Sequence, residues 1–149
     1  MPHIEERTVL YYSSVKEVIF YTGVRFDDFS LENKQELIDL LGEWLIEAKD
    51  YIDTYISRNL QKELEIGKIT NIPPRIHDIA TRIVANKVAQ AVARRTTPLA
   101  TKDSVPTITL SDNIFTDSIK QDLDQFIVNT SKPTLRISRA RSKTERNVW

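Results

Sequence analysis

The sequence contains no cysteine, which excludes disulfide bonds and thiolate metal ligands. Its only histidines are His3 and His77, too few for a histidine-rich metal cluster. Three widely separated glycines, Gly23, Gly42 and Gly67, cannot build either common type of glycine-rich phosphate loop. A nucleophile elbow is missing for the same reason, because its serine needs flanking glycines. We therefore expect no cofactor and no bound metal.

The sequence also lacks long hydrophobic runs. No segment approaches the ~20 consecutive apolar residues that a membrane-spanning helix requires, so no membrane association is expected. The N-terminal stretch has early acidic residues and no apolar run of the kind found in secretory signals. These absences predict a soluble protein made in a reducing cytoplasm. Its 149 residues are enough for one ordinary core, or for one domain with an appendage.

The strongest helical pattern covers residues 31–58. Ser30 is predicted to cap this helix, and Gly42 to mark the close approach of another backbone. The apolar residues recur at intervals of three and four, which places them on one side: Leu37, Leu41, Trp44, Ala48, Tyr51 and Tyr55. The opposite side is acidic. It could be solvated, or it could be a subunit face or channel wall, for which the candidates are Asp39, Glu43, Glu47 and Asp50.

A shorter helix is predicted before this one. Ser14 and Glu17 have the spacing of a capping box, which predicts a helix start, and Gly23 can end the helix in the left-handed conformation. After the long helix, residues 60–66 could extend it or form a separate turn.

The third helix of the predicted bundle follows a proline pair, Pro73 and Pro74, which breaks the chain. Apolar residues at helical spacing predict a helix over residues 75–95, antiparallel to the long one. Its polar residues lie four apart and are expected on the outer side: Asp78, Arg82, Asn86, Gln90 and Arg94. The fold class is therefore predicted as mainly α, a small helical bundle over residues 1–96.

A C-terminal extension follows the bundle. Residues 97–131 are predicted to be a linker and interaction element, in which residues 105–110 could form a short strand. Ser111 or Thr116 then opens a helix. Residues 135–137 alternate apolar and polar side chains and could supply the second strand of a short β-hairpin.

Residues 132–149 are predicted to be an extended arm, because they are too polar to fold alone. Six basic residues against the single acid Glu145 give the arm a net charge of about plus five, which leaves about minus five on the rest. Such an arm indicates a partner with an acidic surface: another copy, another protein or nucleic acid. The candidate partner-binding residues are Arg136, Arg139, Arg141, Lys143, Arg146 and Trp149.

His77, at the start of a predicted helix, is the residue to consider for catalytic chemistry. A general base needs a nucleophile and a pocket, and the sequence shows neither. Asp27 and Asp28 are adjacent acids without further ligands, which makes a poor cation site. The Glu-x-x-His pairs of diiron helix bundles do not occur. We therefore expect no enzyme; a small hydrolase that depends on His77 is an alternative.

Three segments in this order resemble the head–tail connector, or head-completion adaptor, proteins of long-tailed bacteriophages. Residues 15–24 read VKEVIFYTGV, residues 45–58 read LIEAKDYIDTYISR, and residues 72–95 read IPPRIHDIATRIVANKVAQAVARR. The resemblance covers residues 14–95 and consists of hydrophobic patterns rather than chemical signatures. The segment over residues 105–137 goes beyond the family's minimal bundle.

The resemblance implies a structural virion protein, made in the bacterial cytoplasm of the host and located in the neck. In this family, copies form a dodecameric ring beneath the portal protein, extend the DNA channel without sequence-specific DNA binding, and present a platform to a stopper or tail-completion protein. Residues 132–149 would then be an arm that reaches the portal or a neighbouring subunit. The alternative from another class is a small DNA-binding helical module that uses its basic C-terminal tail.

Overall fold

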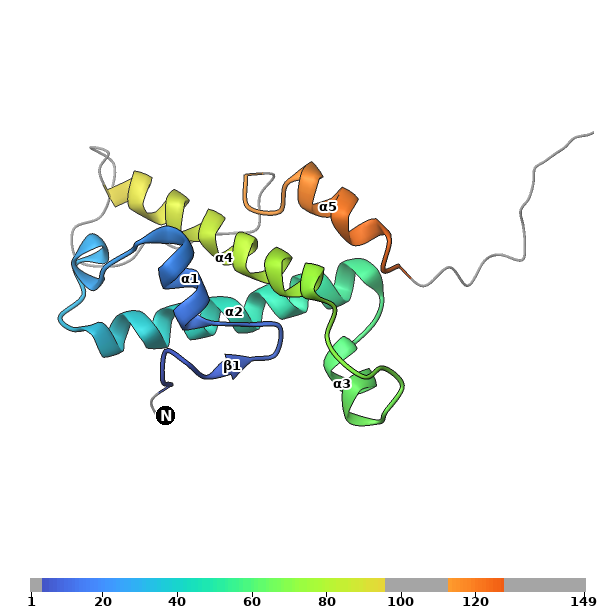
Figure 1. Cartoon of the computed structure of the whole chain (residues 1–149). Helices are drawn as coiled ribbons and strands as arrows, with labels where there is room; N and C mark the ends of the chain where they lie inside the picture. Colours follow the sequence, from blue (N-terminus) through green and yellow to red (C-terminus); the bar gives the residue numbers. More distant parts are fainter. Residues whose placement is uncertain (1–3, 96–112, 128–149) are drawn as a thin grey trace, which may run out of the picture.

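The computed structural model describes residues 4–95 and 113–127. They form a mainly helical bundle with one small antiparallel sheet (Figure 1), which confirms the predicted fold class. The strands predicted at residues 105–110 and 135–137 lie outside the described residues. The elements in chain order are β1 (Val9–Leu10), β2 (Ser13–Ser14), α1 (Val15–Thr22), the 3-10 helix η1 (Phe26–Phe29), α2 (Lys34–Ile56), α3 (Leu60–Glu65), α4 (Pro74–Arg95) and α5 (Asp117–Asp124).

Helix α1 begins and ends where the sequence predicts. The Ser14 hydroxyl accepts a hydrogen bond from the Glu17 backbone N–H at 3.4 Å. Gly23 ends the helix in the left-handed conformation, with φ 69°, and its N–H donates to the Ile19 carbonyl. A residue other than glycine would be strained at this φ, so the position accounts for one of the three glycines.

Helix α2 starts later than the sequence predicts, at Lys34. Its N-cap is Asn33, whose side chain accepts a hydrogen bond from the Glu36 N–H at 3.0 Å, so the prediction of Ser30 as the cap is wrong. Ser30 instead ends η1 in the left-handed conformation, because the turn that buries Phe29 comes first. The helix ends at Ile56 and its 23 residues span about 35 Å.

Residues after α2 form a separate short helix, α3, rather than an extension of α2. Asn59 caps it by accepting a hydrogen bond from the Lys62 N–H at 3.0 Å. Arg58 and Glu63 form a two-pronged ion pair with distances of 3.0 and 2.7 Å. This pairing lowers the pKa of the buried Glu63 carboxyl and fixes α3 against the end of α2.

The core lies between α2 and α4, which run antiparallel as predicted, with α1 packed across both (Figure 1). Helix α4 supplies the centre of the core through its predicted apolar face. Trp44 of α2 meets Phe29 of η1 in an edge-to-face contact, with ring centroids 6.0 Å apart. The fully buried aliphatic residues of the two long helices include Leu41, Leu45, Ile52, Ile56, Ile76, Ile79, Ile83 and Val84.

The polar side of α4 is partly covered, which the sequence did not predict. Helix α5 lies against it, capped by Thr116, which is one of the two predicted caps. Arg82 reaches Asp122 at 2.9 Å, and Asn86 donates to the Ile114 carbonyl at 3.0 Å. This part of the chain, assigned above to a linker and interaction element, joins the same core as the bundle through Ile114, Phe115, Ile119 and Leu123.

Gly42 does mark a close approach, but of side chains rather than of a backbone. A Cβ atom there would lie 2.7 Å from Cδ1 of Ile4 and 3.2 Å from Cδ1 of Leu10. The N-terminal segment therefore crosses α2 at this glycine.

The N-terminal hairpin joins three helices through Tyr12, a feature that the sequence analysis missed. The buried Tyr12 hydroxyl donates to Asp53 of α2 at 2.5 Å and accepts from the Leu60 N–H at the start of α3 at 3.0 Å. Its carbonyl accepts a hydrogen bond from His77 Nδ1 of α4 at 3.0 Å. These bonds hold the preceding Tyr11 at φ 66°, a conformation rare for a bulky residue.

Replacing Tyr12 by Phe should lower the free energy of unfolding by about 1–3 kcal/mol, because a buried donor and acceptor lose their partner. Burial, together with the hydrogen bond to Asp53, raises the pKa of Tyr12. The unfolded chain therefore ionises near pH 10 while the folded chain keeps its proton, so stability should fall as pH rises above about 10.

Urea unfolding at pH 7 and at pH 10.5 tests both points. The exposed Tyr21→Phe is the matched control and should leave stability within about 0.5 kcal/mol of the original chain. Equal effects of the two substitutions at pH 7 would contradict the role given to Tyr12.

Candidate interaction surfaces

The four acids predicted to share one face of α2 have different surroundings. Asp39 is half-buried, and its Oδ1 accepts hydrogen bonds from Gln35 Nε2 at 2.9 Å and from the Ile4 N–H at 3.4 Å. Glu47 is half-exposed and forms an ion pair with Lys87 of α4. These two carboxylates therefore serve contacts within the chain.

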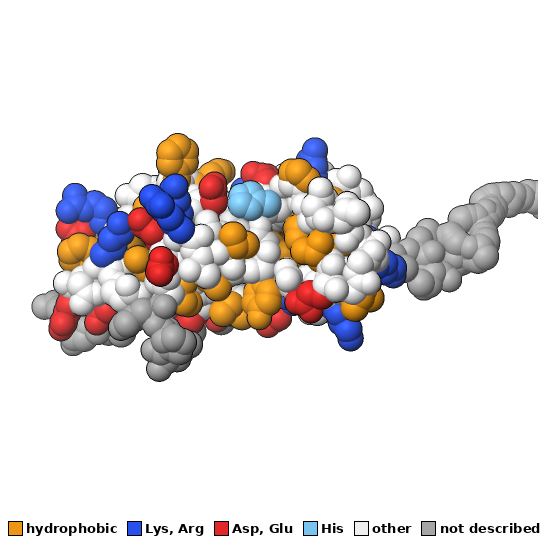
Figure 2. All heavy atoms as spheres, turned by 60° about the horizontal axis from the view of Figure 1, so that its bottom comes forward, with side chains coloured by type: hydrophobic (Ala, Val, Ile, Leu, Met, Phe, Trp, Pro, Cys, Tyr) orange, Lys and Arg blue, Asp and Glu red, His pale blue; other side chains and the backbone are white. Residues whose placement is uncertain are grey.

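The other two acids, Glu43 and Asp50, are exposed and flank an apolar residue, Ile46. Residues spaced by three and four are neighbours on a helix surface, so the three side chains form one continuous strip. Val9 and Tyr11 of the hairpin lie beside it and are also exposed. Figure 2 brings the hairpin side of the molecule forward and shows hydrophobic side chains gathered along it.

A hollow lies where the hairpin meets α2 and the start of α3. Its walls are Val9, Leu10, Tyr11, Ile46 and Gln61, and its volume is about 280 Å³. Lys49 Nζ lies 5.0 Å from the centre of the Tyr11 ring, in position for a cation–π contact. The strained Tyr11 is therefore held in place as one wall of this hollow.

Lys87 is a buried lysine that the sequence analysis did not single out. Its side chain is 1% exposed, and Nζ lies 5.4 Å from the Trp44 ring centre and 5.7 Å from that of Tyr51. Among the ion pairs of the described residues, the Lys87 ammonium group is paired only with the Glu47 carboxylate. The signal was available, because Lys87 follows Ile83 by four positions and so lies within the apolar stripe of α4.

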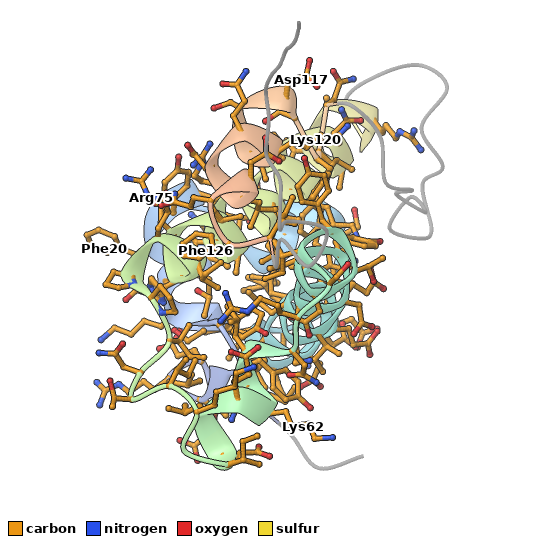
Figure 3. All side chains as sticks on the ribbon, turned by 90° about the vertical axis from the view of Figure 1, so that its right-hand side faces the viewer. Phe20, Lys62, Arg75, Asp117, Lys120 and Phe126 are labelled. Carbon is orange, nitrogen blue, oxygen red and sulfur yellow. The ribbon has the colours of Figure 1, made fainter. Side chains whose placement is uncertain are left out.

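The most exposed large hydrophobic residue of the described chain is Phe20, at 87%. It lies on α1, and Figure 3 shows it at the edge of the molecule, pointing away from the helices. Tyr21 beside it is 60% exposed. Exposed aromatic side chains of this kind are enriched where proteins bind one another.

A larger groove, of about 610 Å³, runs between the end of α1 and the second half of α4. Tyr21, Gly23 and Asp28 line one side, and the alanines of α4 at positions 85, 89 and 93 line the other. Because these side chains are small, they leave room for the groove.

The predicted basic arm lies outside the described residues, so the structure does not place its candidate residues. They are Arg136, Arg139, Arg141, Lys143, Arg146 and Trp149.

His77 has a structural position at the start of α4. Because a carbonyl oxygen only accepts, Nδ1 must donate to Tyr12, and Nε2 lies 3.9 Å from a Glu17 carboxylate oxygen. Within the described ranges, no group of three or more His, Cys, Asp or Glu side chains is placed to bind a metal ion.

No helix in the described part of the chain has the length and apolar character needed to cross a bilayer. The chain matches no family model, no curated protein and no solved structure. Its function must therefore be argued from its own surfaces and from the resemblance carried by residues 14–95.

Proposed function

We propose that this chain is a structural subunit of a bacteriophage neck. Copies form a ring on the portal protein, dodecameric in the family that the chain resembles, which extends the DNA channel and supports a stopper or tail-completion protein. The observation that carries the proposal is the packing of the three resembling segments. They fall on α1, α2 and α4, and these helices pack against one another as one unit.

The charge and the apolar surface of the body also support this function. Residues 4–95 and 113–127 contain eighteen acidic and fourteen basic residues, a net charge of minus four. A ring with an acidic inner surface repels phosphates, so DNA passes without adhering. Exposed Phe20 and the strip around Ile46 lie on different elements, and unlike patches of this kind allow head-to-tail assembly.

The alternative of a DNA-binding module receives less support from α4, the helix with the most basic residues of the described chain. Arg82 is engaged by Asp78 and Asp122, and Lys87 is buried beside Glu47. Phosphate neutralisation would then depend mainly on residues 132–149. Duplex DNA binding that falls steeply with salt and is lost with this segment would favour the alternative.

The direct test is electron microscopy of the purified chain mixed with a portal ring. Added ring density beneath the portal, at the level of the neck, is the expected result. Portal particles without added density, at protein concentrations well above that of the portal, would reject the proposal.

Removing residues 132–149 should abolish ring assembly and leave the bundle folded. Every residue of the described core lies between positions 4 and 127, so the shortened chain keeps all of them. Circular dichroism and size-exclusion chromatography should give an unchanged helical signal and a compact monomer. A loss of helical signal, or assembly equal to that of the full chain, would contradict this prediction.

A further inference from the structure

Phe20 has no structural role within the subunit that explains its identity. The inner side of α1 is formed by Val15 and Val18, which are fully buried, whereas Phe20 points outward at the edge of the molecule (Figure 3). At 87% exposed, the ring contributes almost no burial to the fold. A large aromatic side chain left in water is a typical anchor residue for a protein interface.

We infer that Phe20 of one copy enters the hollow between the hairpin and α2 of the next copy. The hollow of about 280 Å³ is bounded by Val9, Leu10, Tyr11 and Ile46, with Gln61 at one side. An apolar cavity of about 150 Å³ already accommodates a benzene ring, so a phenyl group fits here with room for its approach. The inference rests on the proposed head-to-tail assembly and names the two faces that meet.

Charge around the two sites is complementary, because Lys49 beside Tyr11 is already paired with Asp53 at 2.5 Å. Lys16 lies four residues before Phe20 on the exposed side of α1, whereas the hollow is flanked by Glu43 and Asp50 of α2. Glu17, the acid next to Lys16, faces His77 within the same subunit. Attraction between Lys16 and the α2 carboxylates would orient the incoming Phe20 and disfavour the reverse approach.

The larger groove beside α1 is the other cavity that Phe20 of a second copy could enter. The symmetry of the resulting contact distinguishes this groove from the hollow at the hairpin. Tyr21 lines that groove, so a partner's Phe20 that entered it would bring the ends of two α1 helices together. When each of two copies inserts its Phe20 in this way, the contact is isologous and closes after two copies, which cannot make a ring. The hairpin hollow has no lining residue from α1, the helix that carries Phe20, so the two patches are unlike, as head-to-tail contact requires.

The surface area that Phe20 can bury determines which assay is sensitive enough to detect the contact. A phenylalanine buries about 150–250 Å², and a stable interface needs about 1,200–2,000 Å² in total. The contact is therefore one anchor of the interface, so a covalent trap is the sensitive assay in solution. Because the chain contains no cysteine, a thiol-specific cross-linker reacts only with the cysteines that are introduced.

The test mixes Tyr21→Cys with Val9→Cys chains and adds a short bis-maleimide cross-linker; Tyr21 is exposed beside Phe20, so both chains keep the Phe20 anchor. The control mixes Tyr21→Cys with Gln121→Cys, which is exposed on α5, across the bundle from the hairpin (Figure 1). We expect several-fold more mixed dimer in the test than in the control. Equal yields overturn the inference, as does a dominant product between two Tyr21→Cys chains, which would indicate the isologous pairing.

A second measurement uses ring formation on the portal. Phe20→Ser removes the anchor, and Ile46→Glu places a charge in the hollow. Each variant alone should assemble at least about tenfold more weakly than the original chain. Mixed together, each retains one intact face, so they should give dimers and no ring. If both variants assemble normally, the inference is wrong and the proposed ring remains; if the original chain forms no ring, the proposed function is wrong.

Discussion

Trp44→Ala is expected to lower the free energy of unfolding by about 3–5 kcal/mol. Trp44 is 7% exposed and packs against Phe29, so its removal leaves a cavity between η1 and α2. The substitution also removes one of the two rings that face Lys87. Denaturant unfolding, monitored by the helical circular dichroism signal, measures the change.

Phe20→Ala is the matched control, because it truncates an aromatic residue that is 87% exposed. It should change stability by less than about 0.5 kcal/mol, as surface substitutions usually do. A loss below about 1 kcal/mol for Trp44→Ala would place Trp44 at the surface and contradict the packing of η1 on α2.

The parts of the fold that the sequence predicts are those with strong local signals. The cap at Ser14, the left-handed stop at Gly23 and the proline-led start of α4 each depend on residues close together in the chain. The apolar face of α4 is predicted for the same reason, since a spacing of three and four identifies it without knowledge of its partner.

The start of α2 shows where local reasoning fails. Ser30 and Asn33 are both good N-cap residues, and the sequence offers no local reason to prefer the second. The choice is made by Phe29, whose burial against Trp44 requires the 3-10 turn to finish first.

The prediction that the polar side of α4 faces solvent fails for a related reason. Arg82 looks solvent-facing in its own helix, yet its partner Asp122 lies forty positions later. Hydrophobic periodicity identifies an apolar face, but it does not say which polar residues will find partners on another helix.

The candidate interaction surfaces could also be predicted only in part, because their contacts join residues distant in sequence. The acidic side of α2 was predicted as one surface, but Glu47 is drawn to a buried lysine and Asp39 to the N-terminal segment, both distant in sequence. The exposure of Phe20 is not evident from its residue type, because a phenylalanine on a short amphipathic helix is usually buried. Val15 and Val18 fill the inner side of α1 and leave Phe20 outside.

Glu47→Ala should destabilise the fold by about 2–4 kcal/mol, whereas Lys87→Met should cost little or even stabilise it. Removing Glu47 leaves the Lys87 ammonium, 1% exposed, without its carboxylate. An uncompensated buried charge costs about 3–5 kcal/mol, and the estimate is reduced here because water can reach the half-exposed side on which Glu47 lies. Glu43→Ala, on the exposed side of the same helix, is the control and should have an effect within about 0.5 kcal/mol.

The contrast between the two substitutions is more informative than either value. Methionine keeps an unbranched side chain between Trp44 and Tyr51 and removes the charge that must be desolvated. In the double variant, therefore, Glu47→Ala should lose most of its cost, and a double-mutant cycle should give a coupling of about 2–3 kcal/mol. Equal losses for Glu47→Ala and Lys87→Met, with no coupling, would show that packing of the lysine stem matters and the ion pair does not. A coupling of the expected size would instead identify Glu47 as a carboxylate committed to the fold. Of the four acids predicted to share one face of α2, only Glu43 and Asp50 would then be available to the neighbouring copy of the proposed ring.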